Sequence, residues 1–123
     1  MRRALLLAGA LSLGACSLPT GDFVTYPADA PELANASLVD GVWESGPAAG
    51  AEWLPYPGQV TLDVEHGLGR LPRTILVYVS FDREGREAAL ASGDLARVVD
   101  VGPTTIDVRN GTNAQLFARI VLE

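Results

Sequence analysis

Three residues near the middle of the chain, Asp63, Glu65 and His66, are of types that bind metal ions in proteins. Successive side chains of a strand point to opposite faces, so Asp63 and Glu65 share one face and His66 lies on the other. Coordination by all three would require a bend at the glycines that follow, Gly67 and Gly69. We therefore predict a solvated strand face that ends in a turn histidine, with no metal site and no cofactor.

The same region is the starting point for any catalytic site. His66 is the only histidine, and a Ser-His-Asp triad would have to use it, but the chain has no Gly-x-Ser-x-Gly sequence. No pattern selects two of the 15 Asp and Glu residues as the carboxylate pair of a glycoside hydrolase. Gly67-Leu68-Gly69 lacks the third glycine and the following helix of a dinucleotide-binding loop. We predict no catalytic residues and no enzyme; the alternative is a hydrolase that uses carboxylates from its acidic loops.

Aromatic and proline residues gather before this region, as Trp43, Trp53 and Tyr56, with Tyr56 between two prolines. Exposed aromatic side chains stack on sugar rings and anchor protein interfaces, whereas buried ones fill the core of a small β-domain. We expect the core role for this group. If they are exposed, Trp43, Trp53, Tyr56 and His66 are the candidate ligand-binding residues, for a glycan or a protein.

The single cysteine, Cys16, follows two arginines and an apolar run over residues 4–15. A helix needs about 20 residues to cross a bilayer, so this run is too short. A charged start, a short apolar stretch and small residues are typical of a secretory signal peptide. The sequence Leu13-Gly14-Ala15-Cys16 resembles the lipobox of bacterial lipoproteins, with leucine three residues before the cysteine. The resemblance implies a diacylglyceryl group on the Cys16 sulfur, cleavage after Ala15 and acylation of the new amino group.

The lipobox resemblance also implies a location in the bacterial cell envelope. Acyl chains on one residue make a stable membrane anchor. Ser17 stands where an aspartate would resemble an inner-membrane retention signal, which favours the outer membrane in an organism that has one. The mature chain has a side-chain charge of 7 − 15 = −8, so the lipid, and not electrostatic attraction, holds it to the membrane. The negative charge also argues against a nucleic-acid partner.

Three prolines lie in the first part of the mature chain. Pro19, Pro27 and Pro31 block a helix and favour extended backbone. We expect three segments: a cleaved signal peptide over residues 1–15, a lipidated N-terminus and extended tether over 16–40, and a domain over 41–123. Phe23, Val24 and Tyr26 are candidates to dock part of the tether on the domain.

Alternation of apolar and polar residues predicts β-strands through most of the domain. Residues 59–65 alternate, and residues 74–81 are apolar on both faces, as in a central strand. Further strands are predicted over 42–44, 95–101, 104–109 and 116–122, with Asn110-Gly111 as a hairpin turn. No segment could supply the crossover helix of a parallel sheet. The fold class is therefore all-β, as a small antiparallel β-sandwich or barrel-like domain.

Residues 59–123 resemble the small β-sandwich of phage tail-fibre tips and H-type lectins. The resemblance rests on the strand 60–65, the loop 66–70, Pro72 before an apolar strand, and the terminal strand ending at 122. It implies sugar binding and assembly into homotrimers. We therefore expect a lipid-anchored envelope protein that carries a non-catalytic β-sandwich, as a binding or structural module, with a glycan or an envelope protein as its partner.

Overall fold

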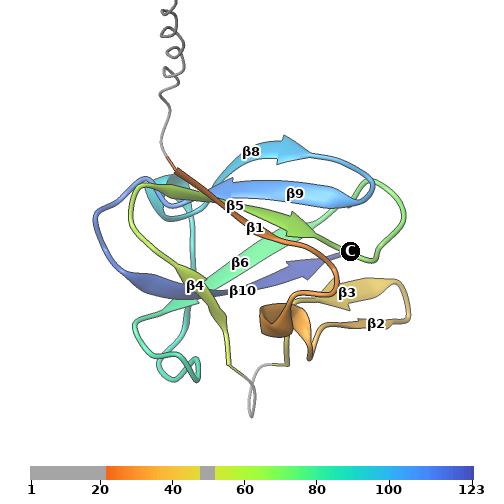
Figure 1. Cartoon of the computed structure of the whole chain (residues 1–123), viewed down its shortest axis with the longest axis horizontal. Helices are drawn as coiled ribbons and strands as arrows, with labels where there is room; N and C mark the ends of the chain where they lie inside the picture. The colour runs from red at the N-terminus through yellow and green to blue at the C-terminus, as the bar shows by residue number, and fades with distance from the viewer. Residues whose placement is uncertain (1–21, 48–51) are drawn as a thin grey trace, which may run out of the picture.

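The computed structural model describes residues 22–47 and 52–123, which form two β-sheets packed as a small sandwich (Figure 1). One sheet has the strand order β1-β5-β9-β8, and the other has the order β2-β3-β10-β6-β7, with β4 also paired to β10. The all-β prediction is confirmed, and the described residues contain no α-helix. The elements are β1 (Asp22–Tyr26), η2 (Pro31–Leu33), β2 (Ser37–Val39), β3 (Val42–Glu44), β4 (Leu54–Tyr56), β5 (Val60–Glu65), β6 (Ile75–Ser80), β7 (Ala89–Leu90), η3 (Gly93–Leu95), β8 (Arg97–Val101), β9 (Thr105–Arg109) and β10 (Leu116–Leu122).

The core lies between the facing sheets and follows the alternation of the sequence. Every second residue of β10 is buried, from Leu116 to Leu122. In the opposite sheet, β5 and β9 bury their own alternate residues against these side chains, among them Leu62 and Ile106. Because one strand face is apolar and the other polar, a shift of one residue would expose the apolar set, and the pattern therefore fixes the register.

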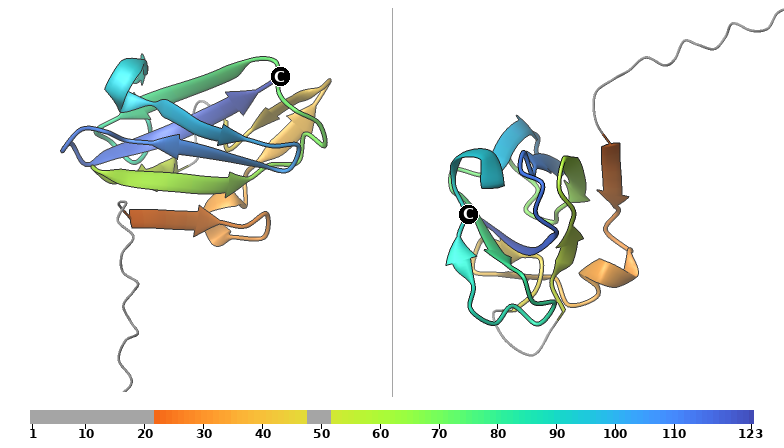
Figure 2. Two further views of the ribbon diagram at one scale, coloured as in Figure 1. Left: turned by 90° about the horizontal axis from the view of Figure 1, so that it is seen from above. Right: turned by 90° about the vertical axis from the view of Figure 1, so that its left-hand side faces the viewer.

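The sheets begin at residue 22, earlier than the expected domain start at residue 41. Strand β1 pairs in parallel with β5, from Asp22 opposite Val60 to Tyr26 opposite Val64, and lies along one edge of the sandwich (Figure 2). Two stretches of the expected tether, β1 and β2, are thus strands of the sheets. The physical reason is burial: Tyr26 and Leu33 enter the core. The part of the tether before residue 22 lies outside the described residues.

The prediction of a hairpin at Asn110-Gly111 is wrong. Strand β9 pairs with β5 and β8, whereas β10 pairs with β3, β4 and β6, so the chain crosses from one sheet to the other at this point. Asn110 is fully buried and holds the crossing. Its Nδ2 donates to the carbonyls of Tyr56 (3.1 Å) and Ala114 (3.0 Å), and its Oδ1 accepts from the backbone N–H of Thr112 (3.0 Å). These side-chain bonds take the place of the backbone hydrogen bonds that would join the two strands of a hairpin.

Candidate functional site

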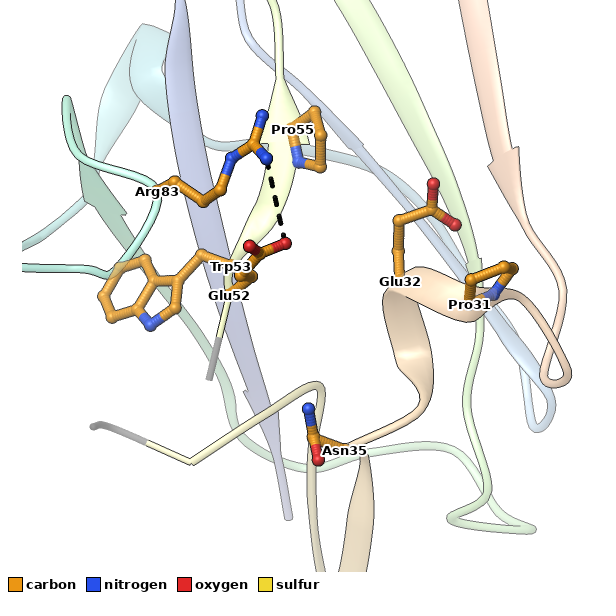
Figure 3. Close-up of a pocket in the computed structure, with 7 residues that line it drawn as sticks. All are labelled: Pro31, Glu32, Asn35, Glu52, Trp53, Pro55 and Arg83. Carbon is orange, nitrogen blue, oxygen red and sulfur yellow. Dashed lines mark ion pairs between the residues drawn. The ribbon is translucent and has the colours of Figure 1, made fainter. Parts of the chain in front are cut away.

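A hollow opens between the segment that follows β1 and the start of β4 (Figure 3). Its volume is about 310 Å³. Its lining joins residues that are far apart in the sequence: Pro31, Glu32, Asn35, Glu52, Trp53, Pro55 and Arg83. The hollow therefore exists only because the N-terminal segment docks on the sandwich.

A tyrosine of β1 forms a hydrogen bond with Pro55, one of the residues that line the hollow. The Tyr26 hydroxyl donates to the carbonyl of Pro55 in β4, at 3.0 Å. Burial, with the charge of Glu32 as a smaller cause, raises the pKa of Tyr26 to about 12, so the hydroxyl keeps its proton and remains a donor. Leu33 of η2 is buried in the core, and this burial fixes the position of its neighbour Glu32, which lines the hollow.

The opposite wall is formed by the segment just before β4 and the loop after β6. The backbone N–H of Trp53 donates to the carbonyl of Arg83, at 2.8 Å. The Arg83 guanidinium lies 3.8 Å from the Glu52 carboxylate and above the ring of Phe117, 5.7 Å from its centroid. Because both charged side chains are more than half exposed, the ion pair itself stabilises the fold little. Its effect is to place a donor and an acceptor side by side at the hollow.

The lining of the hollow combines charged and polar side chains with apolar ring surfaces. Two carboxylates, Glu32 and Glu52, accept hydrogen bonds, the Arg83 guanidinium donates them, and the Asn35 amide does both. Two prolines, Pro31 and Pro55, contribute apolar ring surfaces. Such a set suits a ligand that carries many hydroxyl groups and also has C–H faces, because each hydroxyl can donate to a carboxylate or accept from the guanidinium.

Trp53 is the one sequence-predicted ligand-binding residue that lines the hollow. Only 5% of it is exposed. Its indole packs directly over Gly85, where a Cβ atom would overlap the ring atoms Cε2, Cζ2 and Nε1. Within residues 22–47 and 52–123, the Trp53 Nε1 has no hydrogen-bond partner. Trp53 therefore supports the wall from within and does not present its face to solvent.

The other three predicted ligand-binding residues are structural. Trp43 and Tyr56 are buried in the core, and the Tyr56 hydroxyl donates to the Leu95 carbonyl at 2.6 Å. Burial raises the pKa of Tyr56, so this donor stays protonated. His66 is 4% exposed and lies against Trp43, with 6.1 Å between the ring centroids.

The hydrogen bonds of His66 assign its proton. The backbone N–H of Leu68 donates to Nδ1 at 3.2 Å, so Nδ1 carries no hydrogen. Nε2 lies 3.0 Å from the carbonyl of Gly102 and is therefore the protonated nitrogen. Both imidazole nitrogens are bonded within the fold and His66 does not line the hollow, so the side chain has no free nitrogen for a ligand.

The outer face of the first sheet carries a row of carboxylates. Asp63 lies opposite Asp107 across β5 and β9, and Asp107 lies opposite Asp100 across β9 and β8. Burial, a hydrogen bond with Asp63 and the charges of Asp63 and Asp100 raise the pKa of Asp107 to about 7. Glu65 accepts the backbone N–H of Ala28 at 2.7 Å. Among the described residues, no group of three or more His, Cys, Asp or Glu is arranged to hold a metal ion.

Sequence reasoning missed most of the hollow. Glu32, Asn35, Glu52 and Arg83 stand in segments without a periodic pattern, and each is an ordinary surface residue when read alone. Cys16, the predicted lipidation site, lies outside the described residues. In the described part of the chain, no helix has the length and hydrophobicity needed to span a membrane.

Comparison with known proteins adds no family assignment. No protein-family model matches the chain, and neither curated proteins nor solved structures give a match. The class of protein is therefore defined by the fold alone, as a small β-sandwich, and the lipobox and lectin resemblances stay predictions.

Proposed function

We propose that this protein is a lipid-anchored protein of the bacterial cell envelope whose β-sandwich is a non-catalytic module that binds a glycan. The observation that carries the proposal is the hollow beside Trp53, which has carboxylate acceptors, a guanidinium donor and proline ring faces around one space. Sugar hydroxyls need donors and acceptors together, and sugar C–H faces need apolar surface. The lipobox resemblance at Cys16 supports the anchor, and the lectin resemblance supports the ligand class.

Binding of the purified, detergent-solubilised protein to an array of bacterial surface glycans tests this proposal. We expect a subset of glycans to bind, and we expect Arg83→Ala to abolish that binding because it removes the donor at the hollow. The matched control is Arg73→Ala, which removes an exposed arginine that does not line the hollow. Retained binding in Arg83→Ala, or equal loss in both variants, would contradict the assignment of the site.

A second candidate function is supported by the two carboxylates that face the same hollow. Glu32 and Glu52 lie on opposite walls (Figure 3), and a pair of carboxylates flanking a bond is the arrangement that glycoside hydrolases use. A panel of glycan, peptide and ester substrates separates the two functions. Turnover that disappears in Glu32→Gln or Glu52→Gln would establish a hydrolase and overturn the non-catalytic module.

A further inference from the structure

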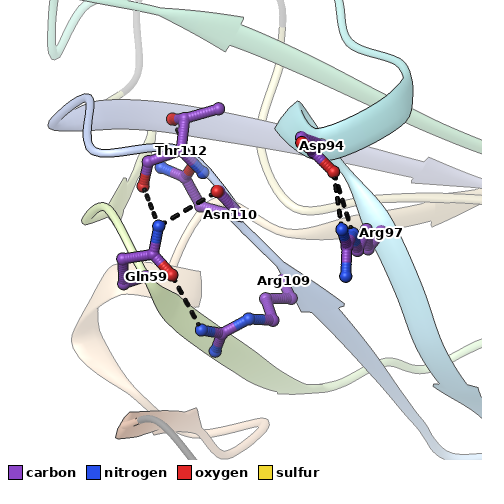
Figure 4. Close-up of polar contacts among 7 residues, drawn as sticks. Gln59, Asp94, Arg97, Arg109, Asn110 and Thr112 are labelled. Carbon is purple, nitrogen blue, oxygen red and sulfur yellow. Dashed lines mark hydrogen bonds and ion pairs between the residues drawn. The ribbon is translucent and has the colours of Figure 1, made fainter.

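We propose that the end of the β-sandwich from which β1 starts rests against the membrane surface. We call this the anchor end, and it comprises Asp22, Gln59, residues 94–97 and residues 109–113. Figure 4 shows Gln59, Asp94, Arg97, Arg109, Asn110 and Thr112 of this set. The proposal deepens the proposed function and rests on it, because it takes the lipid on Cys16 as the attachment point. The partner of this surface is an anionic phospholipid bilayer.

The first argument is the length of chain between the lipid and the sheet. Five residues, 17–21, separate Cys16 from Asp22. At about 3.5 Å per residue, the six steps from Cys16 to Asp22 reach at most about 20 Å. The start of β1 therefore stays within that distance of the acylated cysteine, whereas a free tether as far as residue 40 would have let the domain move well away from the bilayer.

Strand β1 is held firmly enough to set this limit. All five of its residues are in register with β5, from Asp22 opposite Val60 to Tyr26 opposite Val64. Its last residue is buried, and the Tyr26 hydroxyl is bonded to the Pro55 carbonyl. Lengthening the tether would require β1 to leave the sheet and break these contacts.

The strand register identifies what lies beside Asp22. Val60, opposite Asp22, follows Gln59, and Arg109 is opposite Thr61, at the same end of the sheet. Arg97 is opposite Arg109, which brings the start of β8 and η3 to this end as well. The Gly111 N–H donates to the Asp94 carbonyl at 2.7 Å and joins the crossing loop to η3.

The second argument is the distribution of charge. The anchor end carries two carboxylates and two arginines, Asp22, Asp94, Arg97 and Arg109, with a sum of zero. The loop after β6 begins beside this end as well, because Ser80 is opposite Phe117 near the start of β10. With the three carboxylates and two arginines of that loop the sum is −1, and the remaining ten acidic residues and three arginines of the mature chain sum to −7. An anionic bilayer repels that remainder, with a screening length of about 8–10 Å at moderate salt. The nearly neutral end is thus the end that an anionic bilayer repels least.

The side chains of the anchor end suit a headgroup layer. Arg97 is paired with Asp94, with an N–O distance of 2.8 Å. Arg109 donates to Gln59 Oε1 at 3.0 Å and to Thr61 Oγ1 at 3.4 Å, and within the described residues it has no carboxylate partner. Its guanidinium is therefore available to a phosphate group of a lipid.

Two single-cysteine variants test the orientation. Asn113→Cys lies at the anchor end, and Thr104→Cys lies at the opposite end of β9, in the turn after β8; both residues are exposed. In the lipidated protein the Cys16 sulfur is blocked, so a thiol-reactive fluorophore labels the new cysteine. The labelled proteins are reconstituted into vesicles of phosphatidylethanolamine and phosphatidylglycerol that contain a lipid with a nitroxide on its headgroup.

We expect quenching of the fluorophore at position 113 to be several-fold stronger than at position 104. Equal quenching, or stronger quenching at 104, in vesicles that carry the protein on flotation would overturn the orientation. Failure of the protein to float with the vesicles would instead overturn the lipid anchor and, with it, the proposed function.

An insertion separates the tether from other causes of orientation. About twenty Gly and Ser residues, placed between Ser17 and Leu18, would extend the r.m.s. reach of the tether to roughly 25–30 Å and preserve the lipobox. We expect this insertion to bring the quenching at the two positions close together. An unchanged difference would contradict the claim that the short connection holds the anchor end at the membrane.

Discussion

The hydroxyl of Tyr26 donates to the carbonyl of Pro55, and this bond joins the N-terminal strand β1 to β4 at the wall of the hollow. Pro55 has no backbone N–H of its own, and its carbonyl is taken up by a side chain from a segment that is remote in sequence. The bond couples two features of the protein, the docking of β1 and the shape of the hollow.

Tyr26→Phe tests this coupling. The variant leaves the Pro55 carbonyl without its partner, and we expect a loss of about 1–2 kcal/mol in the free energy of unfolding, together with weaker glycan binding. Urea unfolding followed by tryptophan fluorescence measures the first effect. Tyr78→Phe is the matched control, because Tyr78 contributes its ring to a contact with Arg119 and its hydroxyl makes no hydrogen bond within the described residues. Equal losses in both variants would show that the bond has no special role.

Gly85→Ala tests the placement of Trp53. Gly85 and Gly69 have nearly the same backbone conformation, with φ of 77° and 79°. A Cβ atom at Gly85 would overlap the indole of Trp53, whereas one at Gly69 would have no atom within 4 Å. Both alanine variants carry the cost of a left-handed residue, about 1–2 kcal/mol. We expect Gly85→Ala to lose a further 1–3 kcal/mol or so, the usual scale for forcing extra volume into a packed site. Equal midpoints of denaturation would contradict the packing of Trp53 on Gly85.

Asn110→Ala tests the crossing between the sheets. The change leaves the carbonyls of Tyr56 and Ala114 and the N–H of Thr112 without partners. We expect a loss of about 2–4 kcal/mol, since each unsatisfied buried group costs roughly 1–3 kcal/mol and the effects overlap. Asn113→Ala, at an exposed position of the same loop, is the control and should stay within about 0.5 kcal/mol of the parent. A small loss at Asn110 would mean that another contact holds the loop.

The carboxylate row predicts how stability changes with pH. The pKa of Asp107 is raised to about 7 in the folded protein, above its ordinary value of 3.8. Folding therefore favours the protonated form, and the contribution of Asp107 to stability is full below the unfolded pKa and is lost as the pH rises through about 7. We expect the melting temperature to fall between pH 5 and pH 8 and the fall to be smaller in Asp107→Asn. Asp29→Asn, an exposed carboxylate outside the row, should leave the fall unchanged. The same slope in Asp107→Asn would contradict the assignment.

The longer strands could be predicted from the sequence because each carries its own apolar pattern. Strands β5, β6, β8, β9 and β10 fall inside the predicted ranges. Strand β3 also matches its predicted range, 42–44, whereas β2, β4 and β7 were not predicted, because three residues or fewer are too few for an alternation to stand out. Strand β1 forms only by pairing with β5, which lies 38 positions further along the chain. The residues of β1 themselves carry no signal of that pairing.

The candidate site was less predictable than the fold, for a physical reason. The aromatic residues were expected mainly in the core, and Trp43, Tyr56 and Trp53 are indeed buried. The hollow is created by polar residues from three separate segments, which meet only when Tyr26 reaches Pro55. Asn110 misled the hairpin prediction because Asn-Gly is also a good sequence for a buried loop that is closed by its own side chain.

The claim on which the proposed function and the membrane orientation both depend is the lipid on Cys16, and intact mass spectrometry of the protein isolated from bacterial membranes tests it most directly. We predict that the mature chain begins at Cys16 and carries the added mass of a diacylglyceryl group, with or without an N-acyl chain. We also predict that Cys16→Ala loses this mass and no longer partitions into the detergent phase. A parent chain that begins at another residue, or that begins at Cys16 with an unmodified thiol, would contradict the lipid anchor.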